Sequence, residues 1–323
     1  MLSYAELLAR TDRPAGSTWG LFGDDDELGM LNHLTPDRVV RAAGLVRRGT
    51  VFNLDLPVGA FDLPLLHRTP PLHTIFADPP YRRDDKLDGL YLQGSTQVDG
   101  LRHFAHPKHG FYNGMPESEI TPGNPMLGVN RMAEHGIVGR GVLLDVATYL
   151  GDRLDHRGRT TFTVRDLDAT ASAQGVQLEP GDIVLIRTGW LGFVFGLDRD
   201  ERLRMPDDVR STGLVQSEAT LRWIWEHQLA LIAADNLAVE VMPPVPTSPH
   251  FTDPDLSGMQ GFHRGMAHPV LIGLLGLPLG ELWSLDELAE DCRGDGVWEF
   301  MLSAHPLNVM GGVGSPANAL AIK

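Results

Sequence analysis

Helix-type and strand-type segments alternate along this chain, and that alternation restricts its possible folds more than any other feature. The clearest pair begins where Thr163 opens a helix pattern over residues 164–175. A Pro180-Gly181 turn then leads into an apolar strand pattern over residues 182–187. Such alternation with short turns is typical of a single α/β or α+β domain. Further helices are expected at 36–48, 219–228, 261–275 and 286–292, the last with a Ser284–Glu287 capping box, and further strands at 50–58 and 229–235.

The segment from Gly59 to Asn130 interrupts this alternation. Proline, glycine and histidine are dense in it, and its hydrophobic periodicity is poor. It nevertheless carries too many aromatic and apolar residues for disorder. Because long irregular segments inside a compact domain are usually functional, we expect functional loops here.

Charge and cysteine content exclude several classes of protein. The 42 acidic against 27 basic residues give a formal charge of −15, which repels nucleic acid and acidic membrane surfaces. No apolar run is long enough to span a bilayer, and the start of the chain lacks a signal-peptide pattern, so a cytoplasmic protein is expected. The single Cys292 excludes an intrachain disulfide and a cysteine-based zinc cluster. A metal would need histidine, carboxylate or amide ligands.

The stretch QGSTQVDGLRH, residues 93–103, concentrates side chains suited to catalysis. In an extended backbone Gln93, Gln97 and Asp99 share one face, and a turn at Gly100 could return His103 toward them. Alternatively, these polar residues form the solvent-exposed face of an edge strand.

A second polar pair lies far downstream. His268 and Glu281 are embedded in the apolar segment HPVLIGLLGLPLGEL. A carboxylate in such a setting tends to be buried, and a buried charge is costly unless it is paired or bound to a metal. The alternative for Glu281 is a cap on a surface turn.

Several familiar signatures are absent. The sequence contains no Walker A motif and no Gly-x-Ser-x-Gly nucleophile elbow. The segment GGVGSPAN at residues 311–318 resembles a dinucleotide-binding fingerprint only in its glycines. It indicates a tight turn with backbone amides near a site, or a simple loop.

With these residues in place, the chain resembles the cyclase superfamily of metal-dependent hydrolases, which includes kynurenine formamidase and isatin hydrolase. The family signature is His-x-Gly-Thr-His-x-Asp-x-Pro-x-His, followed far downstream by a His and a Glu. Here Thr96, Asp99 and His103 match the signature, and His268 and Glu281 match the downstream pair. Glutamines replace its first two histidines, and a leucine replaces its proline. The resemblance extends over nearly the whole chain, through WGLFGDDDELGMLNHLTPDRV, FYNG, DNLAVEVMPP and GGVGSPANALAIK.

The resemblance implies a swivelling β/β/α single domain with a loop-rich N-terminal extension. Residues 1–50 would form a helical extension packed on the core and residues 51–323 the catalytic domain. It also implies a homodimer or homotetramer and one divalent metal ion, Mn²⁺ or Zn²⁺. The metal ligands carried over are Gln93, Gln97, Asp99, His268 and Glu281. Since amide oxygens are neutral hard ligands, the glutamines should weaken zinc binding.

The activity implied is that of a hydrolase that opens a small cyclic amide, imide or lactone, or cleaves an aryl formamide, by attack of metal-activated water. His103 would be the general acid/base, with Asp99 and Glu281 the other catalytic groups. A metal-free site using His103, Asp99 and Glu240 is the alternative arrangement. The rival functions are a dehydrative ring-closing cyclase and an inactive small-molecule-binding relative.

Residues from separate segments are candidates to contact the small-molecule substrate. They are Trp19, His73, Phe111, Tyr112, Trp190 and Glu240. Aromatic rings in turn-rich segments could hold a planar ring, but each is equally at home in a core, and His73 could be an ordinary loop histidine.

Overall fold

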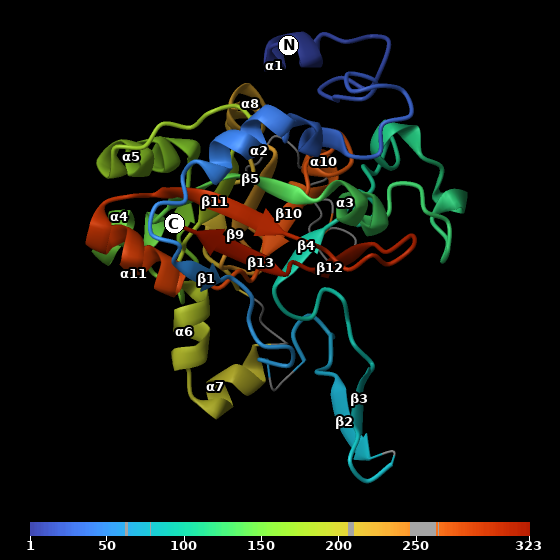
Figure 1. Cartoon of the computed structure of the whole chain (residues 1–323). Coiled ribbons are helices and arrows are strands. Elements are labelled where there is room, and N and C mark those ends of the chain that lie inside the picture. Colours follow the sequence, from blue (N-terminus) through green and yellow to red (C-terminus); the bar gives the residue numbers. More distant parts are fainter. Residues whose placement is uncertain (62–63, 78, 206–209, 246–262, 264) are drawn as a thin grey trace.

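A nine-stranded mixed sheet forms the centre of the molecule in the computed structural model (Figure 1). The structure describes residues 1–61, 64–77, 79–205, 210–245, 263 and 265–323. The strand order is β1-β13-β11-β5-β7-β9-β10-β4-β12. The strands are β1 (Val51–Asn53), β2 (Leu72–Ala77), β3 (Arg83–Asp88), β4 (Gln97–Asp99), β5 (Ile137–Leu144), β6 (Thr161–Phe162), β7 (Ile183–Ile186), β8 (Gly213–Leu214), β9 (Leu231–Ala234), β10 (Leu279–Glu281), β11 (Glu299–Ala304), β12 (Gly314–Pro316) and β13 (Ala319–Ile322).

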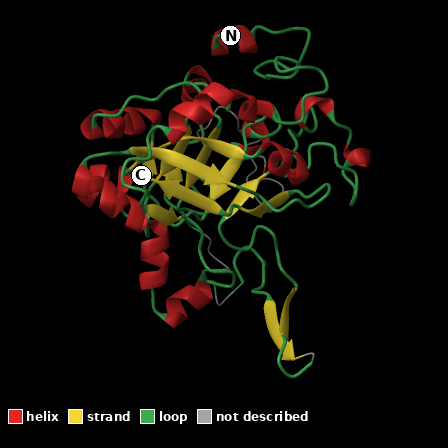
Figure 2. Ribbon diagram, in the orientation of Figure 1, coloured by secondary structure: helices red, strands yellow, loops and turns green. Residues whose placement is uncertain are grey.

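Helices lie around the outside of this sheet (Figure 2). The helix α2 packs on β5 and β11, while α5 contacts β5, α4 and α8. The α-helices are α1 (Tyr4–Leu8), α2 (Pro36–Ala43), α3 (Val129–His135), α4 (Val146–Leu150), α5 (Val164–Gln174), α6 (Trp190–Gly196), α7 (Arg199–Arg204), α8 (Glu218–Glu226), α10 (His268–Leu271) and α11 (Asp286–Asp295). Short 3-10 helices are η1 (Gly29–His33), η2 (Tyr112–Gly114), η3 (Glu117–Glu119) and η4 (Gly151–Arg153). The predicted single α/β domain is confirmed.

Local sequence signals explain the central elements. Thr163 and Asp166 form a capping box at the start of α5, and Gly175 ends the helix in the left-handed conformation at φ 69°. The parallel strands β5, β7 and β9 form the middle of the sheet, and every residue of β7 and β9 is buried. Strands covered on both faces read as continuous apolar runs, which is the pattern of IVLI and LIAA.

Four expectations differ from the structure. The strand expected at 50–58 is much shorter, because only Val51–Asn53 form β1 and pair with β13. The first helix is shorter than residues 36–48, because α2 ends at Ala43 with Gly44 as its C-cap. The helix expected at 261–275 is also shorter. Residues 261, 262 and 264 lie outside the described residues. In the rest of this range, residues 263 and 265 and the four residues of α10 are helical. The expected Ser284–Glu287 capping box is wrong: the Ser284 N–H donates to Leu54 O, so Leu285 becomes the N-cap of α11.

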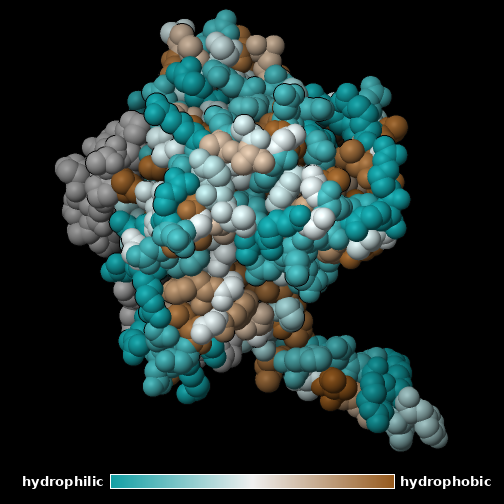
Figure 3. Space-filling view, turned by 90° about the vertical axis from the view of Figure 1, so that its left-hand side faces the viewer, coloured by the Kyte–Doolittle hydropathy of each residue, from teal (hydrophilic) through white to brown (hydrophobic). Residues whose placement is uncertain are grey.

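The irregular segment before β4 carries a two-stranded hairpin, β2–β3. This hairpin extends away from the sheet and helices (Figures 1 and 3). Its side chains are mostly exposed, including Leu72 and Ile75 at 65% each and Tyr81 at 96%. Within the described part of residues 59–130, the expected loops therefore alternate with regular elements, namely the hairpin, β4, η2, η3 and the start of α3.

The first thirty residues are tied to the turn that follows α10. Thr18 N and Met30 N donate to Leu274 O and Gly276 O, and the Trp19 indole Nε1 donates to Gly273 O. The boundary at residue 50 stays a prediction. Among the helices of the described residues, none has both the length and the apolar character needed to cross a bilayer.

Candidate functional site

Strand β4 supplies two side chains of the predicted site. Gln97 and Asp99 alternate with Val98 and therefore share one face of the sheet, and all three residues are buried. The antiparallel register places Glu281 of β10 directly opposite Gln97. Directly opposed side chains on one face are in contact, and the Gln97 Nε2 donates a hydrogen bond to Glu281 Oε2. The sheet thus joins two segments 184 positions apart.

His268 reaches the same place from the start of α10. Its Nε2 lies 3.0 Å from Glu281 Oε1 and 3.9 Å from Asp99 Oδ2. Its Nδ1 lies 2.5 Å from Glu240 Oε1. The Glu240 carboxylate also accepts from Ala267 N at 2.6 Å and from His268 N at 3.2 Å. Glu240 therefore fixes both the backbone and the ring of His268.

The resulting cluster has the composition of a divalent metal site. One ligand atom each from Asp99, His268 and Glu281 lies within 4.8 Å of the others, and all three residues are buried. Asp99 Oδ2 is buried and has no hydrogen-bond partner among the described residues. An imidazole and two carboxylates suit a borderline or hard divalent ion, and three protein ligands leave coordination positions open for reactants. A carboxylate on the far nitrogen of a ligating histidine is also usual in such sites, and Glu240 occupies that place. The residues present therefore fit a divalent ion.

Burial and neighbouring charges shift the titration of these groups. Burial lowers the pKa of His268, but the hydrogen bonds and charges of Glu240 and Glu281 outweigh it and raise the value to about 10. Burial and the charge of Asp99 raise the pKa of Glu281 to about 7. In the metal-free protein the two glutamates therefore favour the imidazolium form of His268. A divalent ion at Nε2 would replace the proton of this imidazolium.

His103 and Gln93 lie beside this cluster. The His103 Nε2 is 3.7 Å from Asp99 Oδ2, and its Nδ1 is 3.1 Å from Gln93 Nε2. The same Gln93 Nε2 is 2.5 Å from Asp99 Oδ1. Burial lowers the pKa of His103 to about 4, against the opposing charge of Asp99, so the ring is neutral at pH 7.

The two glutamines present their amide nitrogens to the carboxylates. Gln93 Nε2 faces Asp99 and Gln97 Nε2 faces Glu281, while the buried Gln97 Oε1 has no partner in the part of the chain that the structure describes. A metal ligand would have to be the amide oxygen, so both amides would have to rotate to coordinate an ion. The ligand role of Gln93 and Gln97 stays a prediction.

The structure places the predicted aromatic contacts in the protein interior. Trp19 and Tyr112 pack against the turn after α10, and the Tyr112 hydroxyl donates to Asp26 Oδ2 at 3.0 Å. Trp190 is fully buried in a small core with Leu282. Phe111 packs partly buried against the main core. Their predicted contact with substrate stays a prediction.

His73 lies apart from these residues, on the hairpin. It is exposed on β2, where its Nε2 lies 2.8 Å from Asp85 Oδ2 on β3. Glu240, another predicted substrate contact, is instead bonded to His268.

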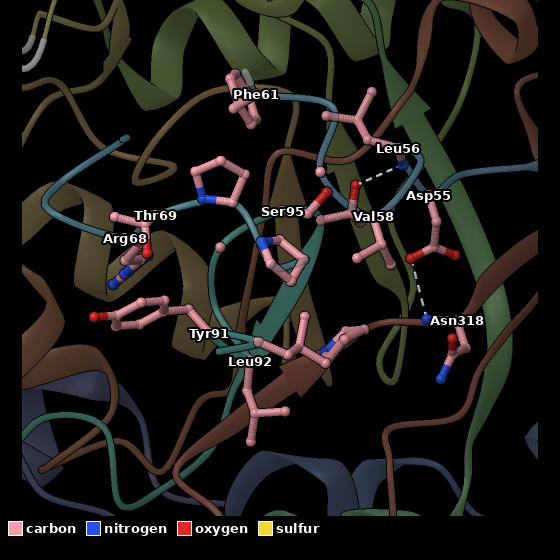
Figure 4. A pocket seen from close by; sticks show the side chains of 17 residues that line it. Asp55, Leu56, Val58, Phe61, Arg68, Thr69, Tyr91, Leu92, Ser95 and Asn318 are labelled. Carbon is pink, nitrogen blue, oxygen red and sulfur yellow. Dashed lines mark hydrogen bonds between the residues drawn. The ribbon is translucent and has the colours of Figure 1, made fainter. Parts of the chain in front are cut away.

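A pocket is lined in part by Gly94, Ser95 and Thr96, the residues between the two glutamines, while Asp99, His268 and Glu281 are not among its lining residues. Arg68 and Tyr91 lie on one side of the view, and Asp55 and Asn318 lie on the other (Figure 4). Apolar side chains complete much of the wall; they include Leu56, Val58, Phe61, Leu92 and Pro316. A small, partly apolar molecule could bind here with polar groups at both ends.

Sequence reasoning missed two residues at the site. Arg68 donates from Nη1 to Gln93 O at 2.5 Å, and its charge lowers the pKa of both Glu281 and His103. Phe104 makes edge-to-face contacts with the rings of His103 and His268, with ring centroids 4.7 and 5.1 Å apart. Adjacency to His103 could have indicated Phe104, whereas no local pattern singles out Arg68.

Comparisons with known proteins agree with this geometry. The family model described as "Putative cyclase" matches residues 60–241. A crystal structure of a novel cyclase is 35% identical and has a TM-score of 0.82, with 95% of this chain and 97% of that chain covered. No curated protein sequence matches the chain.

More distant structures share the fold. Isatin hydrolase A from Labrenzia aggregata, bound to benzyl benzoate, is 18% identical with a TM-score of 0.56, covering 88% of this chain and 97% of that one. Isatin hydrolase A from Ralstonia solanacearum is 18% identical with a TM-score of 0.53, covering 88% and 94%.

Proposed function

This chain belongs to the cyclase family, and from that membership we propose that it is a metal-dependent hydrolase that opens a small cyclic amide. The observation that supports the proposal most is the convergence of Asp99, His268 and Glu281, with ligand atoms within 4.8 Å of one another. Isatin hydrolases, whose name denotes hydrolysis of a cyclic amide, share the fold. Cyclic imides, lactones and aryl formamides are the related substrate classes.

Three residues of the chain would hold the ion, and a fourth would orient one of them. Asp99 Oδ2, His268 Nε2 and a Glu281 oxygen are the donors, while Glu240 keeps His268 Nδ1 occupied and so directs Nε2 to the ion. A bound divalent cation would lower the pKa of water and polarise the substrate carbonyl. Mn²⁺ or Zn²⁺ would suit this mixed oxygen and nitrogen donor set.

Hydrolysis changes two bonds of the substrate. The carbonyl carbon gains a bond to the water oxygen and loses its bond to the ring nitrogen. One proton of water goes to that nitrogen, and the other leaves when the new carboxylic acid ionises. His103 is the residue that we propose to act on these protons, because its Nε2 lies 3.7 Å from Asp99 Oδ2, an oxygen without a partner among the described residues.

The pocket lined by Gly94, Ser95 and Thr96 would receive the ring of the substrate. Its apolar wall and the backbone of Gly94 suit a compact planar molecule. Arg68, at one side of this pocket, would favour the carboxylate that ring opening creates.

Metal analysis followed by an activity screen tests the proposal. Protein purified without chelator should contain close to one divalent ion per chain and should open isatin-type lactams, imides or lactones. Chelation should abolish turnover, and Mn²⁺ or Zn²⁺ should restore it. Asp99→Asn should lose metal and activity together, because the substitution removes a charged ligand.

Two results would contradict the proposal. Turnover that survives complete removal of metal would favour the metal-free arrangement of His103 with Asp99 and Glu240. Stoichiometric metal without turnover on the whole panel, including aryl formamides, would favour a binding protein.

We also propose that the chain forms a homodimer or homotetramer. The exposed β2–β3 hairpin supports this, because an isolated two-stranded hairpin is only marginally stable in water and this one exposes Leu72 and Ile75. Light scattering of the purified protein and of an Ile75→Lys variant tests the proposal. A monomeric wild-type protein would refute it.

A further inference from the structure

Gln93 stands where the family signature has a histidine, and the structure holds this residue from three sides. Its main-chain carbonyl accepts from Arg68 Nη1 at 2.5 Å. Its side chain packs against Gly314 of β12, where a Cβ would come within 2.8 Å of Gln93 Cδ and 3.0 Å of Nε2. Its amide nitrogen contacts Asp99 and His103. The side chain therefore has one well-defined position.

The contact with Asp99 decides which way the amide faces. The atom 2.5 Å from Asp99 Oδ1 must be the NH₂ group, because an amide oxygen there would oppose a carboxylate oxygen with no hydrogen between them. Asp99 is completely buried, so no solvent exposure relieves such a repulsion. Gln93 thus donates one of its two N–H bonds to Asp99.

The second N–H then determines the state of the His103 ring. Gln93 Nε2 lies 3.1 Å from His103 Nδ1. A proton on Nδ1 would set two donors against each other, whereas a bare Nδ1 accepts from the amide. A neutral imidazole carries its proton on one nitrogen, so the proton must be on Nε2.

We propose that Gln93 is a positioning residue that fixes His103 in the tautomer with its proton on Nε2. That N–H lies on the side of Asp99 Oδ2, which is 3.7 Å away and accepts no hydrogen bond from any residue that the structure describes. The consequence for catalysis rests on the proposed function. In this tautomer His103 offers the reacting centre a hydrogen-bond donor, which stabilises the oxygen or nitrogen that gains negative charge; to take a proton from water at Nε2, as proposed above, the ring would first have to move its own proton to Nδ1.

Nitrogen NMR of the metal-free protein tests the tautomer without any activity measurement. Histidine labelled with ¹⁵N is incorporated, and the His103 signals are assigned by their loss in His103→Asn. We expect wild-type Nδ1 to show the shift of an unprotonated nitrogen and Nε2 that of a protonated one. The opposite pair of shifts in the wild type would overturn the proposal.

Two substitutions at Gln93 separate positioning from general structural support. Gln93→Met keeps the length of the side chain but has no donor, so the His103 signals should move toward averaged values for both nitrogens. Gln93→Glu would be protonated through its contact with the buried Asp99 and would present no donor to His103, so the ring proton should move to Nδ1. Gln97→Met is the matched control: it removes an amide that contacts Glu281 and should leave the two His103 signals in place.

Gly314→Ala provides a variant that changes none of the polar groups. The new methyl group would displace the Gln93 amide and should alter the His103 signals in the same direction as Gln93→Met. If Gln93→Met and Gly314→Ala, both folded by circular dichroism, leave the His103 nitrogens unchanged, the proposal is refuted.

Kinetics separate this proposal from the proposed function. In an active hydrolase, Gln93→Met should lower kcat by about 10- to 100-fold with little change in KM, as is usual for residues that orient a catalytic group. If the protein shows the expected NMR shifts but no hydrolytic activity, the proposed hydrolase function is refuted and the proposed tautomer of His103 is supported. If the protein is active but shows the opposite shifts, the hydrolase function is supported and the tautomer proposal is refuted.

Discussion

Metal affinity should depend steeply on pH, because the ion and a proton compete for His268. Nδ1 of this ring is bonded to Glu240, so Nε2 is the nitrogen left for an ion. The glutamates on either side raise the pKa of His268 to about 10 against the effect of burial. At neutral pH the ring must therefore lose a proton before it can bind the metal.

The size of the effect follows from these values. Because the pKa of His268 is about 10, removing its proton at pH 7 reduces the free energy of metal binding by roughly 4 kcal/mol. Affinity should rise about tenfold per pH unit between pH 7 and 8.5. Below pH 7 the slope should steepen, because burial and Asp99 raise the pKa of Glu281 to about 7 and a second proton must leave.

Calorimetric titration of Mn²⁺ into metal-free protein measures both quantities. Runs at pH 6.5, 7.5 and 8.5, in buffers of different ionisation enthalpy, give the dissociation constant and the number of protons released. In Glu240→Gln the pKa of His268 should fall, so the dependence on pH should level off at a lower pH than in the wild type. Equal affinity at pH 6.5 and 8.5 without proton release would refute the arrangement of His268 as a metal ligand.

Three further predictions concern single residues. His103→Ala should abolish turnover while metal content stays near that of the wild type, because the ring is not a primary ligand; near-normal kcat would refute its role. Burial, with a smaller contribution from Arg38, lowers the pKa of His33 to about 4. The unfolded chain, with a pKa near 6.5, therefore binds a proton that the folded chain excludes, so stability is full above pH 6.5 and falls by up to about 3 kcal/mol toward pH 4. Urea unfolding at pH 7 and 4.5 should show this loss, and His33→Gln should reduce it; equal losses would count against the assignment. Gly213→Ala should destabilise the fold by about 1–3 kcal/mol, because its Cβ would lie 2.3 Å from the Glu240 carbonyl carbon; an unchanged melting temperature would contradict this.

The sequence alone determined the class of fold and the elements with strong local signals. The helix α5 and the strands β7 and β9 agree with their expected positions, since capping residues and apolar runs act over a few positions. The length of the helix around α10 was overestimated, because apolar periodicity does not show where contacts with other segments end a helix. The chemistry of Asp99, His268 and Glu281 could be proposed from their residue types and from family resemblance.

Only the tertiary structure decided how those residues meet. Opposition of Gln97 and Glu281 depends on the register of β4 against β10, which no local pattern specifies. Likewise, Glu240 reaches His268 across 28 positions, and Arg68 reaches the main chain of Gln93 across 25. A glutamine offers an oxygen or a nitrogen with nearly the same shape. Its role as ligand or donor is therefore set by the neighbour it faces, and buried carboxylates draw the nitrogens of Gln93 and Gln97 toward themselves.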